Sequence, residues 1–163
     1  VAAPAMEQLS ERTGHSAHLV VINKGETVVI ATIAGAADIS FTLRLGYRRS
    51  ALDATSGKII IAFQDEARRS GIIAESAKSS RAKVDRAALA QELDKVAKQG
   101  FLIAESHDVI GVTDIGAPIL DKRGRAIVSW RFWRGGRRER RRCRSTIRDR
   151  RFWRGDRGKR HSF

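Results

Sequence analysis

The chain has 163 residues and a formal net charge of +14 at pH 7, enough for one domain with its own core but too short for two of usual size. Residues 1–130 contain 17 Lys and Arg against 15 Asp and Glu, whereas residues 131–163 contain 15 against 3, so the basic character belongs to the last segment. The single cysteine, Cys143, excludes a disulfide framework or a multi-thiolate metal site within one chain. We therefore expect a reducing, cytoplasmic setting, and no membrane partner because no apolar run approaches the ~18–20 residues of a span.

The first predicted elements are a short helix and a β-hairpin. Met6 and Leu9 have helical spacing, and Gly14 is suited to end the helix as its C-cap. Two apolar, β-branched runs then flank Lys24-Gly25-Glu26 within residues 16–35, which predicts two antiparallel strands joined by a tight turn.

A third strand and a buried helix are expected next. Residues 39–45 alternate apolar and polar side chains, which predicts a strand with one apolar face. Residues 52–63 combine small residues with an apolar run, which indicates a short buried helix. The run Ile59-Ile60-Ile61 favours a strand locally, so both alternatives stay open there.

The clearest helix lies between Asp85, an available N-cap, and Gly100, which stops it. Three strand-like segments follow at 101–106, 109–120 and 126–130, and the turn 121–125 joins the last two. The order of helix, three strands, helices and three strands predicts an α+β fold, an antiparallel sheet with helices packed on it.

Three segments, in this order and spacing, resemble the C-terminal effector-binding domain of the IclR family of bacterial transcription regulators: AMEQLSERTGHSAHLVVIN, LRLGYRRSALDATSGKIIIAF and ELDKVAKQGFLIAESHDVIGVTDIGAPILDKRGRAIVSW. The resemblance extends from about Pro4 to Ser129. It implies a GAF-like fold that binds a small carboxylic or aromatic-acid metabolite without a cofactor, and assembly into homodimers or tetramers. It also implies that operator DNA is contacted only through an N-terminal winged helix-turn-helix domain that is absent here. The missing initiator Met agrees with a fragment whose N-terminal neighbour has been removed.

The resemblance implies a ligand site between the sheet and the helix that begins near Ala54. The residues carried over as ligand-binding are Phe41, Thr55, Ser56, Ala104, Glu105, Asp114 and Ser129. The hydroxyls of Thr55 and Ser56, with the free N–H groups of their helix turn, suit a carboxylate. Asp114 stands in an otherwise apolar strand, where a carboxylate needs a partner or a role. Ordinary packing is the alternative for Thr55, Ser56 and Phe41, and a strand bulge is the alternative for Asp114.

Three positions depart from the family pattern at this site. Ala104, Glu105 and His107 flank the position of another polar contact of the family, and Ala104 has lost that polar group, so the identity of the ligand does not transfer. Arg131 and Trp133 replace two small hydroxyl residues on the last strand, and side chains of this size pointing inward would obstruct binding as the family performs it.

Enzyme chemistry has little support. The four histidines lack metal-ligand spacing, and neither a Ser-His-Asp elbow nor a phosphate-binding loop is present. We therefore expect no catalytic residues and no metal site, although His18 and His107 could converge on a carboxylate.

The Arg-rich segment 131–163 has two interpretations and marks a boundary after residue 130. Residues 1–130 contain 22 Ala and residues 131–163 contain none, as expected if a one-base slip in a GC-rich gene turns alanine codons into arginine codons. Alternatively, the segment is a nucleic-acid-binding arm whose twin RFWRG units neutralise phosphates and stack on bases. In either case residues 137–151 contain only two apolar residues, so a helix there would have no apolar face to bury. We expect this segment to become ordered only when it binds an anionic partner.

Overall fold

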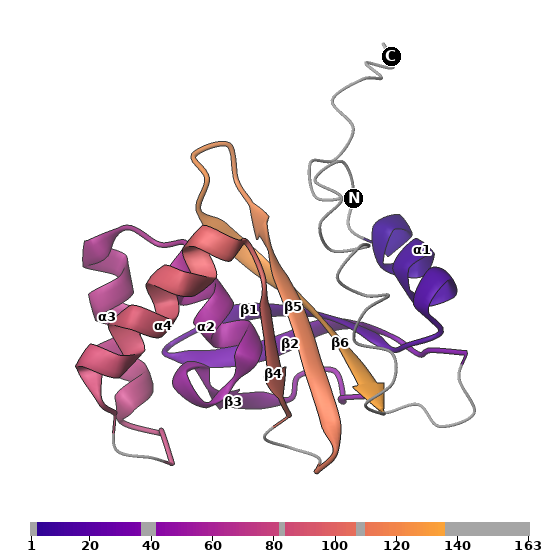
Figure 1. The fold of residues 1–163 in the computed structure, drawn as a ribbon, viewed down its shortest axis with the longest axis horizontal. Coiled ribbons are helices and arrows are strands. Elements are labelled where there is room, and N and C mark those ends of the chain that lie inside the picture. Colours follow the sequence, from indigo (N-terminus) through magenta and orange to yellow (C-terminus); the bar gives the residue numbers. More distant parts are fainter. Residues whose placement is uncertain (1–2, 37–41, 82–83, 107–109, 136–163) are drawn as a thin grey trace.

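The computed structural model describes residues 3–36, 42–81, 84–106 and 110–135. Within them, an antiparallel sheet of six strands has the order β3-β2-β1-β6-β5-β4. Helices α2, α3 and α4 lie on one side of this sheet and α1 lies on the other (Figure 1), which confirms the predicted α+β class. The elements are α1 Ala3–Thr13, β1 Ala17–Asn23, β2 Glu26–Ile33, β3 Arg48–Ser50, the 3-10 turn η1 Ala51–Asp53, α2 Thr55–Ala62, α3 Glu66–Ala77, α4 Arg86–Gln99, β4 Leu102–Glu105, β5 Val112–Leu120 and β6 Ala126–Gly135.

The predicted first helix and hairpin are both confirmed. Gly14 ends α1 with φ +71°, and its N–H donates to the Ser10 carbonyl at 2.7 Å. The two residues between β1 and β2, Lys24 and Gly25, both have positive φ, at 51° and 74°. This backbone matches the right-handed twist of the paired strands, so a two-residue turn closes the hairpin.

The predicted third strand at 39–45 is wrong in its described part. Residues 42–44 form no strand, and the third strand of the chain is the short β3, Arg48–Ser50. Gly46 reverses the chain with φ +79°, and its N–H donates to the Val29 carbonyl. The Leu43 N–H donates to the His18 ring instead of to a neighbouring strand. The apolar alternation therefore does not correspond to a ladder, and Leu45 is exposed.

The run Ile59-Ile60-Ile61 is helical, as the helix prediction for 52–63 required. All three side chains are buried in α2, where the helix packs against the sheet and α4. Burial on several sides of the helix outweighs the modest β preference of isoleucine. Helix α3, which the sequence analysis did not single out, begins at the N-cap Asp65, whose side chain accepts from the Arg68 N–H.

The second half of the chain follows the predicted order. Asp85 accepts from the first N–H groups of α4, and Gly100 ends that helix with φ +80°. The predicted last strand is longer than 126–130, because β6 runs to Gly135. Its residue Phe132 pairs with Ala17 of β1 and Ile115 of β5, so the first residues of the Arg-rich segment lie in the centre of the sheet. Residues 136–163 lie outside the described residues.

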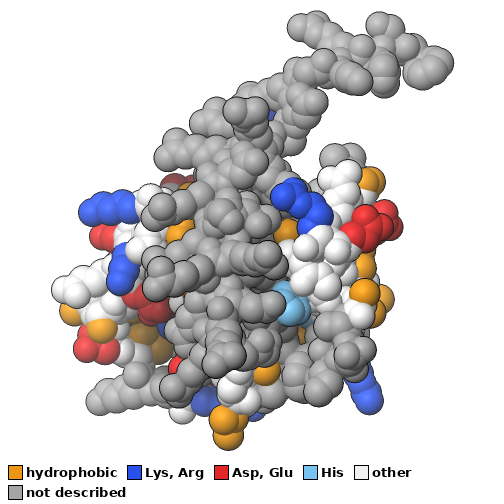
Figure 2. Space-filling model, turned by 45° about the vertical axis from the view of Figure 1, so that its right-hand side comes forward, with side chains coloured by type: hydrophobic (Ala, Val, Ile, Leu, Met, Phe, Trp, Pro, Cys, Tyr) orange, Lys and Arg blue, Asp and Glu red, His pale blue; other side chains and the backbone are white. Residues whose placement is uncertain are grey.

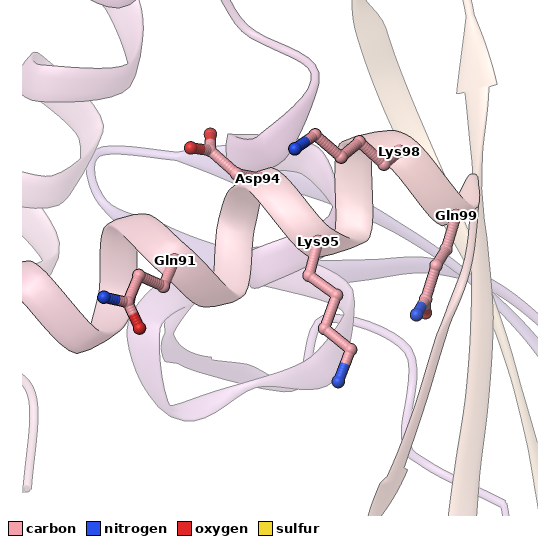
Figure 3. A pocket seen from close by; sticks show the side chains of 5 residues that line it. All are labelled: Gln91, Asp94, Lys95, Lys98 and Gln99. Carbon is pink, nitrogen blue, oxygen red and sulfur yellow. The ribbon is translucent and has the colours of Figure 1, made fainter.

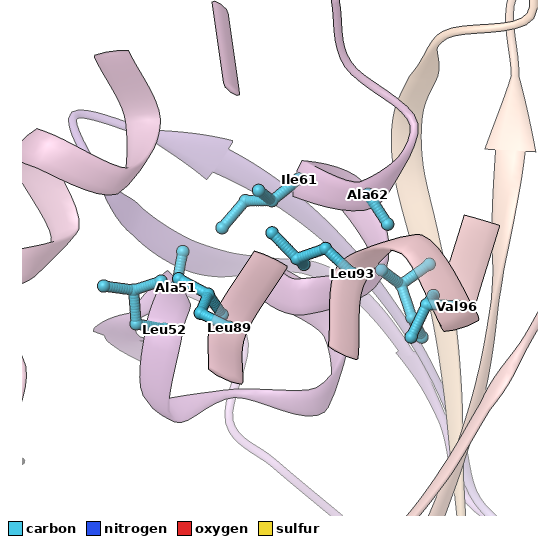
Figure 4. Packing of buried hydrophobic residues seen from close by; sticks show 8 residues of the cluster. Ala51, Leu52, Ile61, Ala62, Leu89, Leu93 and Val96 are labelled. Carbon is cyan, nitrogen blue, oxygen red and sulfur yellow. The ribbon is translucent and has the colours of Figure 1, made fainter. Parts of the chain in front are cut away.

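The sheet has an apolar core on each face. On one face, Met6 and Leu9 of α1 pack on Ala17, Leu19 and Ile115. On the other face, α2 and α4 enclose a second cluster (Figure 4), against which Ile22 and Leu102 of the sheet are packed. The cluster members are Ala51, Leu52, Ile59, Ile61, Ala62, Leu89, Leu93 and Val96. No helix among the described residues has the length and hydropathy of a membrane span.

Candidate functional site

The N-terminus of α2 is buried against the sheet. Thr55 and Ser56, its first two residues, are 3% and 1% exposed. The preceding residue, Ala54, provides no side-chain cap for the helix. The first N–H groups of a helix lack intrahelical partners and carry the positive end of the helix dipole, so this turn favours a negatively charged group.

Asp114 of β5 provides such a group. Its side chain is 2% exposed, and its Oδ2 accepts a hydrogen bond from the Thr55 Oγ1 at 3.2 Å. The two residues are 59 positions apart in the chain and meet because α2 packs across β5 and β6. Helix and sheet are therefore joined here by a buried polar contact beside an apolar core, where polar groups cost free energy unless they are hydrogen-bonded.

The strand register determines which residue of β4 lies beside Asp114 on the face of the sheet that the helices cover. Ala104 is the Cα partner of Asp114 in the antiparallel pair of β4 and β5, and directly opposed residues share a face. Leu102, two residues earlier, packs against the α2–α4 cluster, which identifies this face as the helix-covered one. Glu105 is exposed and pairs with Thr113, so the structure does not bring it to Asp114.

The β6 positions also follow from register. Trp133 is the Cα partner of Asp114, and Arg131 is the Cα partner of Gly116. Ser129 is opposite Pro118, four residues along β5 from Asp114, which is about 13 Å at the usual rise of a strand. Thr55, Ser56, Asp114 and Ala104 thus form a local group, whereas Ser129 lies at a distance along the strand. The remaining predicted residues, Phe41 and His107, lie outside the described residues.

His18 is a residue that the sequence analysis did not assign to this face. It is 0% exposed, and its Nε2 accepts from the Leu43 N–H at 2.9 Å. His18 is four residues before Ile22 in the same strand, so the two side chains point to the same face. Ile22 packs against the helices, which places His18 on the α2 side of β1. The sequence carried little signal for this, because residues 17–22 are all apolar except the histidine, which alone breaks the run.

Nothing in the described ranges gathers three or more His, Cys, Asp or Glu side chains as a metal site requires. One surface hollow lies elsewhere, along α4, and is lined by Gln91, Asp94, Lys95, Lys98 and Gln99 (Figure 3). All of its lining residues belong to one helix, so no second element encloses a ligand there. Charges of both signs are scattered over the described part of the surface in Figure 2, as the near balance of charge in residues 1–130 predicts.

Comparisons with known proteins agree with the fold described above. The family model described as the C-terminal domain of the bacterial transcriptional regulator IclR matches residues 1–148. A probable HTH-type transcriptional regulator, ArcR of Halobacterium salinarum, is 32% identical over 120 residues, which are 70% of this chain and 46% of the relative. The chain therefore spans about half the length of this curated relative.

Solved structures show the same fold. The C-terminal domain of the Escherichia coli transcriptional regulator KdgR has a TM-score of 0.72 at 22% identity, covering 90% of this chain and 87% of that one. The inducer-binding domain of an Acinetobacter PobR double mutant, solved with 3-hydroxybenzoic acid, has a TM-score of 0.65 at 19% identity, with 82% and 81% covered.

Proposed function

Because the chain belongs to the IclR family of bacterial transcriptional regulators, as a C-terminal domain of that family, we propose that it is the effector-sensing part of such a regulator. It binds a small organic acid and thereby controls a helix-turn-helix domain that contacts operator DNA. It acts in the cytoplasm as a homodimer or tetramer, without catalysis and without a cofactor. The observation that carries the proposal is the buried contact between Thr55 and Asp114 at the uncapped start of α2.

The charges at this place restrict the chemistry of the effector. The first N–H groups of α2 and the hydroxyl of Ser56 are donors suited to a carboxylate, while the single proton of the Thr55 hydroxyl is donated to Asp114. The Asp114 carboxylate lies within 3.2 Å of the Thr55 hydroxyl and would repel a second carboxylate placed directly beside it. An effector that also carries a hydroxyl group removes this conflict, because the hydroxyl donates to Asp114. A hydroxy-carboxylic acid is therefore the proposed class.

A structural relative supports this class. The PobR inducer-binding domain, which shares the fold, was solved with 3-hydroxybenzoic acid, a molecule with one carboxylate and one hydroxyl. In this chain, the acid binds with its carboxylate toward α2 and its hydroxyl toward Asp114. A preference for one of two quaternary arrangements then converts binding into a change at the DNA-binding domains.

Calorimetric titration with pairs of acids that differ by one hydroxyl tests the proposal. We expect 3-hydroxybenzoate to bind roughly tenfold or more tightly than benzoate, or lactate more tightly than propionate, because only the hydroxy acid adds a hydrogen bond to Asp114. Thr55→Val and Asp114→Asn should each weaken binding of the hydroxy acid by a similar factor.

Thr27→Val is the matched control. Thr27 is also buried and its hydroxyl also donates a hydrogen bond, to the Arg49 carbonyl at 3.1 Å, but it lies on β2 away from Asp114. This variant should lose some stability and keep its affinity for the acid. Equal affinity for both members of every pair, or equal losses in Thr27→Val and Thr55→Val, would refute the assigned site.

A further inference from the structure

Residues 42–44 are attached to the sheet by side chains of β1 and of the residue before it. The Leu43 N–H donates to the buried His18 Nε2 at 2.9 Å, and the hydroxyls of Ser16 and Thr42 lie 3.2 Å apart. Gly46, by contrast, is held by a main-chain acceptor: its N–H donates to the carbonyl of Val29 at 2.8 Å. Only the first of these acceptors can take up a proton near neutral pH.

The bond at Leu43 fixes the protonation state of His18. A ring nitrogen accepts a hydrogen bond only while it carries no proton, and the imidazolium ion has two N–H donors and no acceptor. The Leu43 N–H is itself a donor, so a proton on Nε2 would place two donors against each other. Because His18 is 0% exposed, water does not replace the lost partner without a local opening.

Charged residues occur on several of the elements around His18. The segment itself contributes Arg44, next to Leu43, and β6 places Arg131 as the Cα partner of His18. On β5, beyond β6, Asp114 shares the helix-covered face. Helix α2 has one charged residue, Lys58, whose Nζ is paired with Glu92 at 2.9 Å. Of the sheet positions named, Arg131 is directly opposite His18 in register, whereas Asp114 lies one strand further away.

We propose that His18 is a pH-dependent latch for residues 42–44. At neutral and higher pH the neutral ring holds the Leu43 N–H, and the segment lies closed on β1. As the pH falls and the ring takes up a proton at Nε2, this bond breaks and residues 42–44 detach, while Gly46 stays bonded to Val29. Since His18 lies on the α2 side of the sheet, acid opens the domain beside that face. The latch operates in the protein without any effector.

Amide exchange measured by NMR on the whole chain tests the latch, with protection factors corrected for the intrinsic effect of pH. From about pH 8 to about pH 5, protection of the Leu43 amide should fall roughly tenfold or more, and that of Gly46 should stay constant. The Gly46 amide is the internal control because its acceptor, the Val29 carbonyl, does not titrate.

Two variants separate the latch from general effects of acid. His18→Gln keeps an acceptor oxygen near the position of Nε2 but takes up no proton, so the Leu43 protection should become independent of pH. His15→Gln removes a neighbouring histidine and should leave the pH dependence unchanged. A constant ratio of Leu43 to Gly46 protection in the unmodified chain overturns the proposal, and so does a pH dependence that persists in His18→Gln. The first of these comparisons decides the matter even if His18→Gln does not fold.

Discussion

Two glycines inside helices should respond in opposite ways to the same substitution. Gly57 is in α2, where it is buried, and a Cβ added to it would lie 2.6 Å from the Ala51 Cα, 2.7 Å from the Ala51 carbonyl carbon and closer still to the carbonyl oxygen. Gly71 is in α3, exposed, with nothing within 4 Å of an added Cβ. Neither has the positive φ that would strain an alanine, so the difference is one of packing alone.

The magnitudes follow from these distances. Ordinary contacts of a Cβ begin at 3.4 Å, so Gly57→Ala requires α2 and η1 to separate by more than an ångström at the Ala51 carbonyl oxygen. Ala51 is 0% exposed and its main chain is the obstacle, so no flexible side chain can give way. Overpacking of this kind costs about 3 kcal/mol, and the better helix propensity of alanine returns about 1 kcal/mol. The net expectation is a loss of roughly 2 kcal/mol, whereas Gly71→Ala should gain about 0.5–1 kcal/mol.

Urea unfolding followed by circular dichroism measures both free energies. For a domain of this size, about 2 kcal/mol corresponds to a fall in Tm of roughly 4–8 °C. Because Gly57 stands two residues after Thr55, its alanine variant should also lose affinity for the hydroxy acid, and Gly71→Ala should not. A Gly57→Ala protein as stable as the unmodified chain would show that α2 and η1 are not in close contact, and the reasoning would fail.

Three further outcomes are expected. The pKa of Asp121 is lowered below its ordinary 3.8, above all by the hydrogen bond from the main-chain N–H of Arg125. The ionised carboxylate should therefore stabilise the turn above pH 3.8, and this stabilisation should be lost as the pH falls through the folded-state pKa. An NMR titration in which the Asp121 carboxyl group has a pKa above 3.8 would contradict this. Ser76→Ala removes the hydroxyl that donates to the Gly25 carbonyl at 2.6 Å, and urea unfolding should show a loss of about 1–3 kcal/mol, with no loss meaning that the buried contact is not formed. If residues 136–163 bind nucleic acid, affinity for a single-stranded oligonucleotide should fall steeply with added salt and vanish on their deletion, whereas binding that survives deletion would refute that role.

The ends of helices and strands were predicted correctly where one residue determines the local backbone conformation. Asp85 and Gly100 bound α4 as expected, because an N-cap side chain and a glycine in the left-handed region act within one turn of the helix. The turn at Lys24 and Gly25 was likewise readable, since it depends on two residues and the strands beside them.

The candidate site was only partly readable. Thr55, Ser56 and Asp114 were identified by resemblance to a family, and the contact between Thr55 and Asp114 then required α2 to cross β5. Glu105 was carried over along with Ala104, but neighbours in a strand point to opposite faces, and only register shows which face is buried. Ser129 was separated from the other residues by its position along the strand, opposite Pro118, which again only register shows.

The sequence by itself determined the class of fold, the hairpin, the capped helix α4 and the buried character of α2, because these depend on composition, periodicity and contacts within a few residues. Only the tertiary structure decided that residues 42–44 leave the sheet to bind His18, that β6 continues to Gly135, and that a threonine and an aspartate 59 positions apart share a hydrogen bond. Each of these depends on free energy gained between distant segments, which exceeds the small local preferences that a sequence pattern expresses.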